Sequence, residues 1–210
     1  DAFLKEEYGP LNQKQQELMT KVFSTNEHLI RLINDLLDVS RIEEGKFGYI
    51  FTQSDIADIL RKVTKNLETN AKVKNVTLAF EEPKQPLSKA SIDADKLELA
   101  IQNIVDNAVK YSNPGGHAAV RIRGEERTLL VIVEDAGIGI PEEDRPFIFN
   151  KFFRARNAIL YQTEGSGLGL FIAKSIVEKH DGFITFESEE NKGSTFVIHL
   201  PLDQKIEFRK

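Results

Sequence analysis

The apolar residues between Leu11 and Ile42 recur every three or four positions, which is the spacing of one face of an α-helix. A stripe of this width is typical of a helix in a bundle of hairpins rather than of a two-stranded coiled coil. A single helix cannot bury its own stripe, so we expect this part of the chain to form a homodimer. The stripe comprises Leu18, Val22, Leu29, Ile30, Leu32, Ile33, Leu36, Leu37 and Val39.

Residues 1–46 are interpreted as part of a helical hairpin. They would contain the end of one helix, a turn at Gly9-Pro10 and a complete second helix that ends at Gly45. The first seven residues are typical of a helix end, but they include no initiating Met and no capping signal. We therefore expect the beginning of the first helix to lie before Asp1.

From residue 47 onward, the period of the apolar residues alternates between that of strands and that of helices. Strands are predicted at 49–53, 76–80, 90–92, 117–123, 129–134, 183–187 and 195–200, and helices at 55–71, 96–110 and 168–179. This pattern favours an α+β fold, a two-layer sandwich whose mixed, largely antiparallel sheet is covered by three helices on one face. Residues 47–203 would form this domain, and 204–210 a C-terminal tail. Between 135 and 165 the sequence predicts a long irregular stretch with a short apolar helix at 147–152. Its segment 152–165 is the candidate for a lid.

The composition excludes several classes of function. The formal net charge is −5 and no basic block occurs, which argues against binding to duplex nucleic acid. The sequence has no cysteine, so it offers no disulfide, thiolate nucleophile or cysteine-ligated metal centre. No apolar run approaches the ~20 residues of a membrane-spanning helix, and the N-terminus shows no signal peptide.

The helix predicted at 96–110 carries the first candidate for chemistry. Asn103, Asn107 and Lys110 follow one another at spacings of four and three residues, so they share one helix face. Two carboxamides and an ammonium group suit a hydrated Mg²⁺ ion with its phosphates, because Mg²⁺ prefers oxygen ligands and keeps several waters. A solvated polar face is the alternative for this stripe taken alone.

A second candidate is Asp135-Ala136-Gly137-Ile138-Gly139, directly after the strand predicted at 129–134. Gly137 and Gly139 would let the backbone approach a flat ligand closely. The carboxylate of Asp135 only accepts hydrogen bonds, so it would pair with the exocyclic amine of adenine and repel the carbonyl group of guanine. The alternative is a tight turn that Asp135 caps locally.

Glycines also open the helix predicted at 168–179, in Gly165-Ser166-Gly167-Leu168-Gly169-Leu170. Backbone N–H groups at a helix N-terminus form a cradle for phosphate, and a flexible hinge is the other interpretation. The segment Phe149-Asn150-Lys151-Phe152-Phe153-Arg154 lies between the two glycine-rich turns. Its phenylalanines are interpreted as core anchors rather than as a platform for a base, and Arg154 would either reach a phosphate or remain in water.

The order of these motifs, followed by Gly193-Ser194-Thr195-Phe196 in the last strand, resembles the catalytic and ATP-binding domain of sensor histidine kinases. The resemblance covers essentially the whole chain. It implies a Bergerat-type ATP-binding fold whose N, G1, F and G2 boxes lie at 103–111, 135–139, 149–154 and 165–170. It also implies that the leading helix is the second helix of the family's dimerisation and phosphotransfer hairpin.

The resemblance further implies roles for individual residues. Asn103 and Asn107 would hold Mg²⁺, and together with Lys110, which would contact phosphates, they would form the catalytic set. Asp135 would hold the adenine. The remaining nucleotide-binding residues would be Tyr111, Gly137, Gly139, Phe149, Arg154, Gly165, Gly167, Leu168, Gly169 and Thr195.

The function implied by the resemblance is that of a histidine protein kinase. MgATP would donate its γ-phosphate to a histidine of the hairpin, and the phosphoryl group would pass to an aspartate of a response-regulator receiver domain. The family's His-acidic-x-Arg-x-Pro string is absent from this sequence, so we expect the acceptor to precede Asp1 and this chain alone not to autophosphorylate. The resemblance also suggests a membrane-anchored parent protein with this portion in the cytoplasm.

Alternative functions stay open. ATP-hydrolysing clamps share the fold but place Glu where this sequence has Asn103, and a carboxamide cannot act as a general base. A serine kinase of the anti-sigma type would not need the leading helix, and a non-catalytic dimerisation and docking module would keep only a vestigial pocket.

Among the histidines, His180 is predicted at a helix end, where a partly charged imidazole would interact favourably with the helix dipole.

Overall fold

The computed structural model describes residue 9 and residues 11–83, 85, 87–162 and 165–202. The helix end and turn proline predicted before residue 11 and the tail predicted at 204–210 lie outside the described residues. The chain divides into two compact units, residues 1–46 and residues 47–210. In the part of the chain that is described, no helix combines the length and apolar character needed to cross a membrane.

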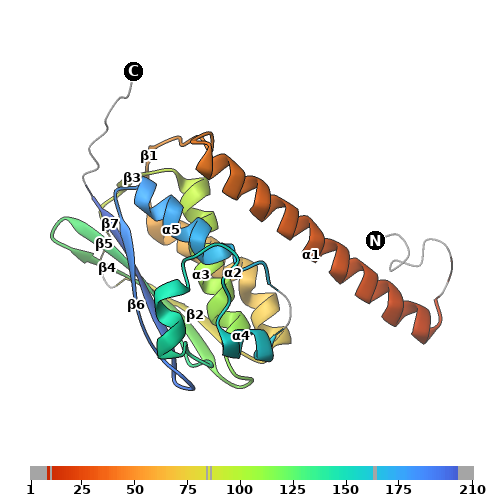
Figure 1. Ribbon diagram of the computed structural model, residues 1–210. Coiled ribbons are helices and arrows are strands. Elements are labelled where there is room, and N and C mark those ends of the chain that lie inside the picture. The colour runs from red at the N-terminus through yellow and green to blue at the C-terminus, as the bar shows by residue number, and fades with distance from the viewer. Residues whose placement is uncertain (1–8, 10, 84, 86, 163–164, 203–210) are drawn as a thin grey trace. The chain divides into compact units, whose positions relative to one another are not determined.

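The first unit contains α1, Gln13–Glu43, drawn in orange to red in Figure 1. The Asn12 side chain accepts a hydrogen bond from Gln15 N–H at 3.0 Å, and Gln15 Oε1 accepts one from Asn12 N–H at 2.9 Å. This reciprocal capping box satisfies N–H groups that have no partner within the helix. The apolar stripe lies open along α1: Leu18, Val22, Leu29, Ile30, Ile33, Leu36 and Leu37 are 48–57 % exposed.

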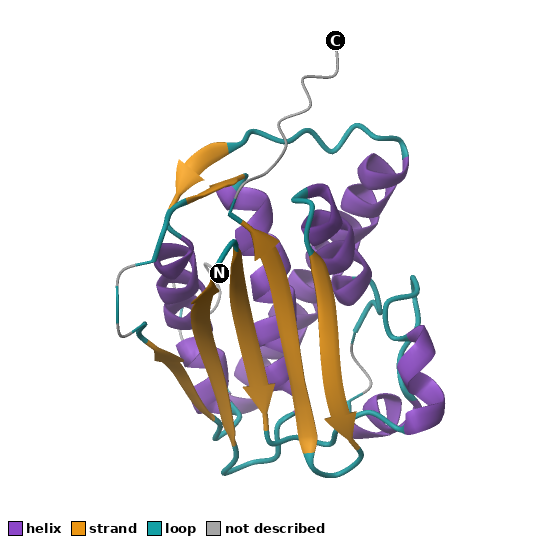
Figure 2. Ribbon diagram, turned by 90° about the vertical axis from the view of Figure 1, so that its left-hand side faces the viewer, coloured by secondary structure: helices purple, strands orange, loops and turns teal. Residues whose placement is uncertain are grey.

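The second unit is built on a five-stranded sheet with helices on one of its faces (Figure 2). In spatial order the strands are β2 (Thr77–Glu81), β4 (His117–Glu125), β5 (Thr128–Asp135), β7 (Gly193–Pro201) and β6 (Phe183–Glu189). The β2–β4 pair is parallel, and the other three pairs are antiparallel. Two short strands, β1 (Thr52–Ser54) and β3 (Ala90–Ile92), form a separate antiparallel pair. The α+β class and the largely antiparallel sheet predicted from the sequence are confirmed.

Three helices cover the sheet: α2 (Ile56–Val73), α3 (Ala94–Tyr111) and α5 (Gly169–Lys179). Their inner faces bury Leu60, Ile104 and Ile176, each at most 1 % exposed, against strand residues such as Val131 and Ile198. Burying a side chain of this size contributes about 1.5–3 kcal/mol, so the interface between the layers dominates the stability of this unit. It also fixes the end of α3 and the start of α5 relative to the end of β5.

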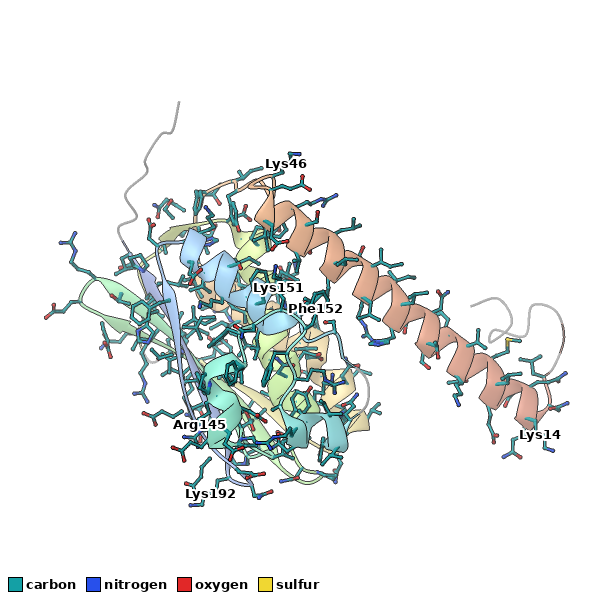
Figure 3. All side chains as sticks on the ribbon, in the orientation of Figure 1. Lys14, Lys46, Arg145, Lys151, Phe152 and Lys192 are labelled. Atoms are coloured by element: carbon teal, nitrogen blue, oxygen red, sulfur yellow. The ribbon has the colours of Figure 1, made fainter. Side chains whose placement is uncertain are left out.

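The segment between β5 and α5 differs from the sequence prediction. The helix predicted at 147–152 is wrong: Phe147 ends a 3₁₀ helix η1 (Glu142–Phe147), and residues 148–152 form turns before α4 (Arg156–Tyr161). Phe152 has a φ angle of 63°, which a right-handed helix cannot contain. Its side chain, labelled in Figure 3, is 63 % exposed. The helix α4 is only six residues long, too short for its periodicity to be recognised.

His180 lies buried at the C-terminal end of α5 and joins three segments. Its Nε2 accepts a hydrogen bond from Asp93 N–H at 3.0 Å, and its Nδ1–H donates to Ile176 O at 2.8 Å. The rings of Tyr49 and Phe51 pack edge-on against the imidazole, with centroid distances of 5.9 and 5.0 Å. The expectation of a partly charged imidazole is therefore wrong, because burial lowers the pKa of His180 and keeps the ring neutral at pH 7.

His180→Ala is expected to lower the free energy of unfolding by about 2–4 kcal/mol at pH 7.5, since it leaves a cavity and an unpaired Asp93 N–H. In the wild type, the lowered pKa means that protons bind preferentially to the unfolded chain, so stability falls as the pH drops below the ordinary His value of 6.5. The loss caused by the substitution should therefore be smaller at pH 5.5. Urea unfolding at both pH values measures this, with the exposed His117→Ala as control. An equal loss at both pH values would contradict it.

Candidate functional site

The residues predicted to carry chemistry gather where β5 and α3 end and α5 begins. Asn103 and the first turn of α5 are in direct contact, because a β-carbon on Gly169 would lie 3.3 Å from Asn103 Oδ1. The Nδ2 atom of Asn103 is buried and has no hydrogen-bond partner. Asn107 lies half-buried one turn further along α3, before Lys110. The N-terminus of α5 thus faces a carboxamide with an unused donor, a group that an anionic ligand would satisfy.

Two cations meet the glycine-rich turn before α5. A β-carbon on Gly165 would lie 2.8 Å from Lys110 Nζ and 3.5 Å from Arg154 Cζ. Lys110 Nζ is also 5.3 Å from the centre of the Tyr111 ring. Burial raises the pKa of Tyr111, while a hydrogen bond to the Arg154 guanidinium acts in the opposite direction. An ammonium and a guanidinium beside exposed backbone form a site for phosphate.

The opposite end of the site is formed by Asp135, the last residue of β5. Gly137 N–H donates to Asp135 Oδ1 at 2.9 Å, and Ser194 N–H donates to the same carboxylate. Burial raises the pKa of Asp135 to about 6, although these two hydrogen bonds lower it. Gly137 has no room for a side chain, because a β-carbon would lie 2.3 Å from Tyr111 O. The G1 turn therefore brings the carboxylate, the α3 terminus and bare backbone together.

The sheet register identifies a residue that the sequence analysis missed. Asp135 pairs with Ser194, whereas Thr195 pairs with Glu134 on β5 and Glu187 on β6. Successive strand residues point to opposite faces, so Ser194 shares the face of Asp135 and Thr195 lies on the other face. The register therefore places Ser194, and not the predicted Thr195, on the face of Asp135. Side chains alternate between the two faces of a strand, so counting back two residues from the apolar Phe196 could have indicated that Ser194 lies on the covered face.

Three predicted residues support the site without lining it. A β-carbon on Gly139 would lie 2.0 Å from Glu189 O, so this glycine lets the G1 turn dock on the β6–β7 hairpin. A β-carbon on Gly167 would lie 2.7 Å from the Phe152 carbonyl carbon, so this glycine packs against the segment before the lid. Leu168 is 2 % exposed and belongs to the core.

Phe149 lies apart from the other predicted residues. Its ring packs against Phe186 of β6 at 5.9 Å, and Lys174 Nζ lies 5.6 Å from its centre. It lines a surface pocket of about 460 Å³ beside Phe171 and Lys151, the latter labelled in Figure 3. The structure therefore does not bring Phe149 to Asp135 or Lys110, and its interpretation as an anchor describes its contacts better than a nucleotide contact.

The lid segment is held down by hydrogen bonds to backbone carbonyls. Asn157 Nδ2 donates to Gly139 O at 2.9 Å, and Tyr161 OH donates to Ser112 O at 2.7 Å. The Arg154 guanidinium donates to Ala158 O and to the carbonyl of Gln162. No sequence motif marks Asn157 or Tyr161, because their acceptors are main-chain carbonyls. They place α4 (teal in Figure 1) across the G1 turn and the end of α3.

Comparison with known proteins agrees with this geometry. The family model described as "Histidine kinase-, DNA gyrase B-, and HSP90-like ATPase" matches residues 92–204. The circadian input-output histidine kinase CikA of Synechococcus elongatus is 33 % identical over 207 residues, which cover 98 % of this chain and 28 % of that protein. The sensor histidine kinase WalK of Bacillus subtilis is 35 % identical over 183 residues, which cover 86 % of this chain and 30 % of that protein. The chain thus spans less than a third of the length of these relatives.

Solved structures give the same result. Full-length ShkA in complex with AMPPNP has a TM-score of 0.77 and 25 % identity, over 95 % of this chain and 41 % of that chain. The catalytic domain of the histidine kinase ThkA has a TM-score of 0.63 and 27 % identity, over 73 % of this chain and 98 % of that chain. The chain belongs to the family of histidine kinase-, DNA gyrase B- and HSP90-like ATPases. Within this family, its second unit is the catalytic ATPase domain of a sensor histidine kinase.

Gly137→Ala is expected to lower the free energy of unfolding by about 1–3 kcal/mol, because the new methyl group overlaps the Tyr111 carbonyl and neither backbone can move freely. Gly124→Ala is the matched control. Its β-carbon would meet side-chain ends, Leu87 Cδ2 at 3.2 Å and Leu129 Cδ2 at 3.8 Å, and the nearer one can rotate away. Urea unfolding of both variants measures the difference. Equal effects of the two substitutions would show that the G1 turn tolerates a side chain.

Proposed function

We propose that this chain binds MgATP and donates the γ-phosphate to a histidine of a dimerisation hairpin, from which it passes to an aspartate of a response regulator. The observation that carries the proposal is the convergence of Asp135 at one end of the site and Lys110 at the other on glycine-rich backbone. The ATPase family and the AMPPNP complex of ShkA support nucleotide binding by this domain.

The adenine would lie at the Asp135 end. The carboxylate accepts hydrogen bonds from Gly137 N–H and Ser194 N–H and retains further lone pairs for the exocyclic amine. Tyr111 O is already engaged by Ile138 N–H at 3.1 Å, which holds the G1 turn in place beside the base. A buried acceptor that is not matched by a donor is costly, so this end selects a base that presents an amine.

The phosphates would lie at the Lys110 end. Lys110 and Arg154 supply positive charge beside Gly165, and the first N–H groups of α5 point toward the same place. The carboxamides of Asn103 and Asn107 fit a hydrated Mg²⁺ ion, and the unused Nδ2–H of Asn103 would donate to a phosphate oxygen. Bound Mg²⁺ would neutralise the phosphates as charge develops on them.

Transfer at this site would depend on positioning and on charge stabilisation. The acceptor imidazole is its own nucleophile, so the ATP-binding domain need not supply a general base. Asn103 cannot take a proton from water at neutral pH, which distinguishes this site from a hydrolytic clamp with Glu at that position. The chain would therefore hold ATP without rapid hydrolysis until an acceptor histidine is presented.

Partners follow from the same proposal. The apolar stripe of α1 would pair with a second copy in a helical bundle, since seven of its nine side chains are 48–57 % exposed. ThkA has been solved in complex with the response regulator TrrA, and we propose a receiver domain as the partner of this chain as well. The acceptor histidine would lie before Asp1, so this chain alone would not autophosphorylate. A kinase that uses ATP in this way would act in the cytoplasm.

Asp135→Asn is expected to weaken ATP binding at least tenfold, because the amide can turn a donor toward the adenine amine. In the wild type, the affinity should fall about tenfold between pH 8 and pH 5, since only the ionised carboxylate accepts and its pKa is about 6. Calorimetry with MgATP measures both effects. Glu134→Gln, on the opposite face of β5, is the control and should change the affinity less than twofold. An unchanged MgATP affinity of Asp135→Asn would contradict the assignment of the adenine end.

Phosphoryl transfer is tested with radiolabelled ATP and a separately supplied hairpin helix that carries an acceptor histidine. We expect acid-labile phosphate on the supplied helix and none on this chain alone. Asn103→Ala should reduce the labelling at least tenfold, because it removes a group proposed to position Mg²⁺ and phosphate. Rapid release of inorganic phosphate without labelling would instead indicate a hydrolytic clamp. ATP binding without labelling of any hairpin would indicate a docking module.

A further inference from the structure

Three polar residues form a row across neighbouring strands beside the proposed adenine end. Asp135 of β5 is paired with Ser194 of β7, and Ser194 is paired with Ser188 of β6. Paired residues lie on the same face of a sheet. Val133 and Phe196, two residues before Asp135 and two after Ser194, are buried on this face. The row therefore lies on the helix-covered side, and Ser188 is its outermost member.

The hydroxyl group of Ser188 connects two segments that border the site. Its Oγ accepts a hydrogen bond from Ile140 N–H at 2.8 Å and donates to Gly193 O at 3.0 Å. It also lies 2.9 Å from Ser194 Oγ. A serine hydroxyl has one proton, and that of Ser188 points to Gly193 O. Ser194 must therefore supply the proton of the bond between the two hydroxyl groups.

This direction of donation decides what Ser194 presents to the site. When its proton points to Ser188, the lone pairs of Ser194 Oγ remain as acceptors, while Ser194 N–H donates to the Asp135 carboxylate. Two neighbouring acceptors then face the base edge. Adenine offers an amine there and guanine offers a carbonyl oxygen, so Asp135 and Ser194 both favour adenine.

Ser188 also anchors the turn that carries Gly137. Beside its bond to Ile140 N–H, Asn191 N–H donates to Ile138 O at 2.7 Å, and Gly139 fits against Glu189 O with no space for a β-carbon. The G1 turn is thereby fixed to the β6–β7 hairpin at the level of Ser188. Removing the hydroxyl would release the turn and the Ser194 proton together.

We infer that Ser188 is a positioning residue for purine selection, which orients the Ser194 hydroxyl and holds the turn 137–140 so that the site accepts adenine and rejects guanine. The inference rests on the proposed nucleotide function, because it assigns the base-selecting end of that site. Ser188 acts through Ser194 and the turn, and it makes no contact with the nucleotide itself.

The test measures the affinities of MgATP and MgGTP for the full chain by calorimetry. Ser188→Ala is expected to weaken ATP binding about tenfold and to lower the ratio of the ATP affinity to the GTP affinity. Ser188→Thr keeps the hydroxyl group, so its ATP affinity and its affinity ratio should match those of the wild type. Thr185→Ala is the matched control. Its hydroxyl lies on the same strand but on the other face, 2.9 Å from His199 Nε2, and its loss should change neither affinity.

A double-mutant cycle separates positioning from general stability. If Ser188 acts through Ser194, then Ser188→Ala should change the ATP-to-GTP ratio less than twofold in a Ser194→Ala background. Additive effects, or an unchanged ratio in Ser188→Ala alone, would overturn the inference. Should Ser188→Ala fail to unfold cooperatively, the nearly isosteric Ser188→Cys takes its place with the same expected direction. A wild type that binds neither nucleotide would refute the proposed function instead.

Discussion

The nucleotide site depends on the close approach of main chain to the polar end of α3. Three glycines make this approach possible, since a β-carbon at any of them would come within 3.3 Å of α3 atoms. The contacts are Gly169 with Asn103, Gly165 with Lys110 and Gly137 with Tyr111. Each places N–H groups beside a side chain or carbonyl of the helix. The packing of α3 against the sheet and beside α5 keeps these distances short, so the core of the domain directly determines the geometry of the site.

The two ends of the site have opposite electrostatic character. Asp135 and Ser194 offer acceptors at a partly buried end, where burial raises the carboxyl pKa to about 6. Lys110, Arg154 and the N-terminus of α5 supply positive charge at the other end. ATP has a donor amine at its base and negative charge at its phosphates, so under the proposed function this polarity would admit it in one orientation. The hydrogen bonds of α4 to Gly139 O and Ser112 O hold the lid at the Asp135 end, against the G1 turn and the end of α3.

The sequence predicted the turns correctly where a motif depends on the backbone conformation of glycine. The glycine-rich segments 135–139 and 165–170 were recognised because positive φ angles and absent side chains are specified by glycine itself. Prediction failed where a side chain had to be assigned to one face of a strand. Thr195 was chosen from its motif, but the pairing with β5 turns it away and presents Ser194. The lid helix was missed because its residues bind main-chain carbonyls from distant segments.

By itself, the sequence determined the local elements, the α+β class and the family, because periodicity, capping residues and ordered motifs are properties of short stretches of chain. Tertiary structure alone decided that Ser194 and not Thr195 shares the face of Asp135, how the lid lies and which histidine is buried. These outcomes depend on strand register and on contacts between residues far apart in the sequence. Ser188 shows the difference: it has no recognisable sequence signal, and only the pairing of β5, β7 and β6 aligns it with Ser194 and Asp135.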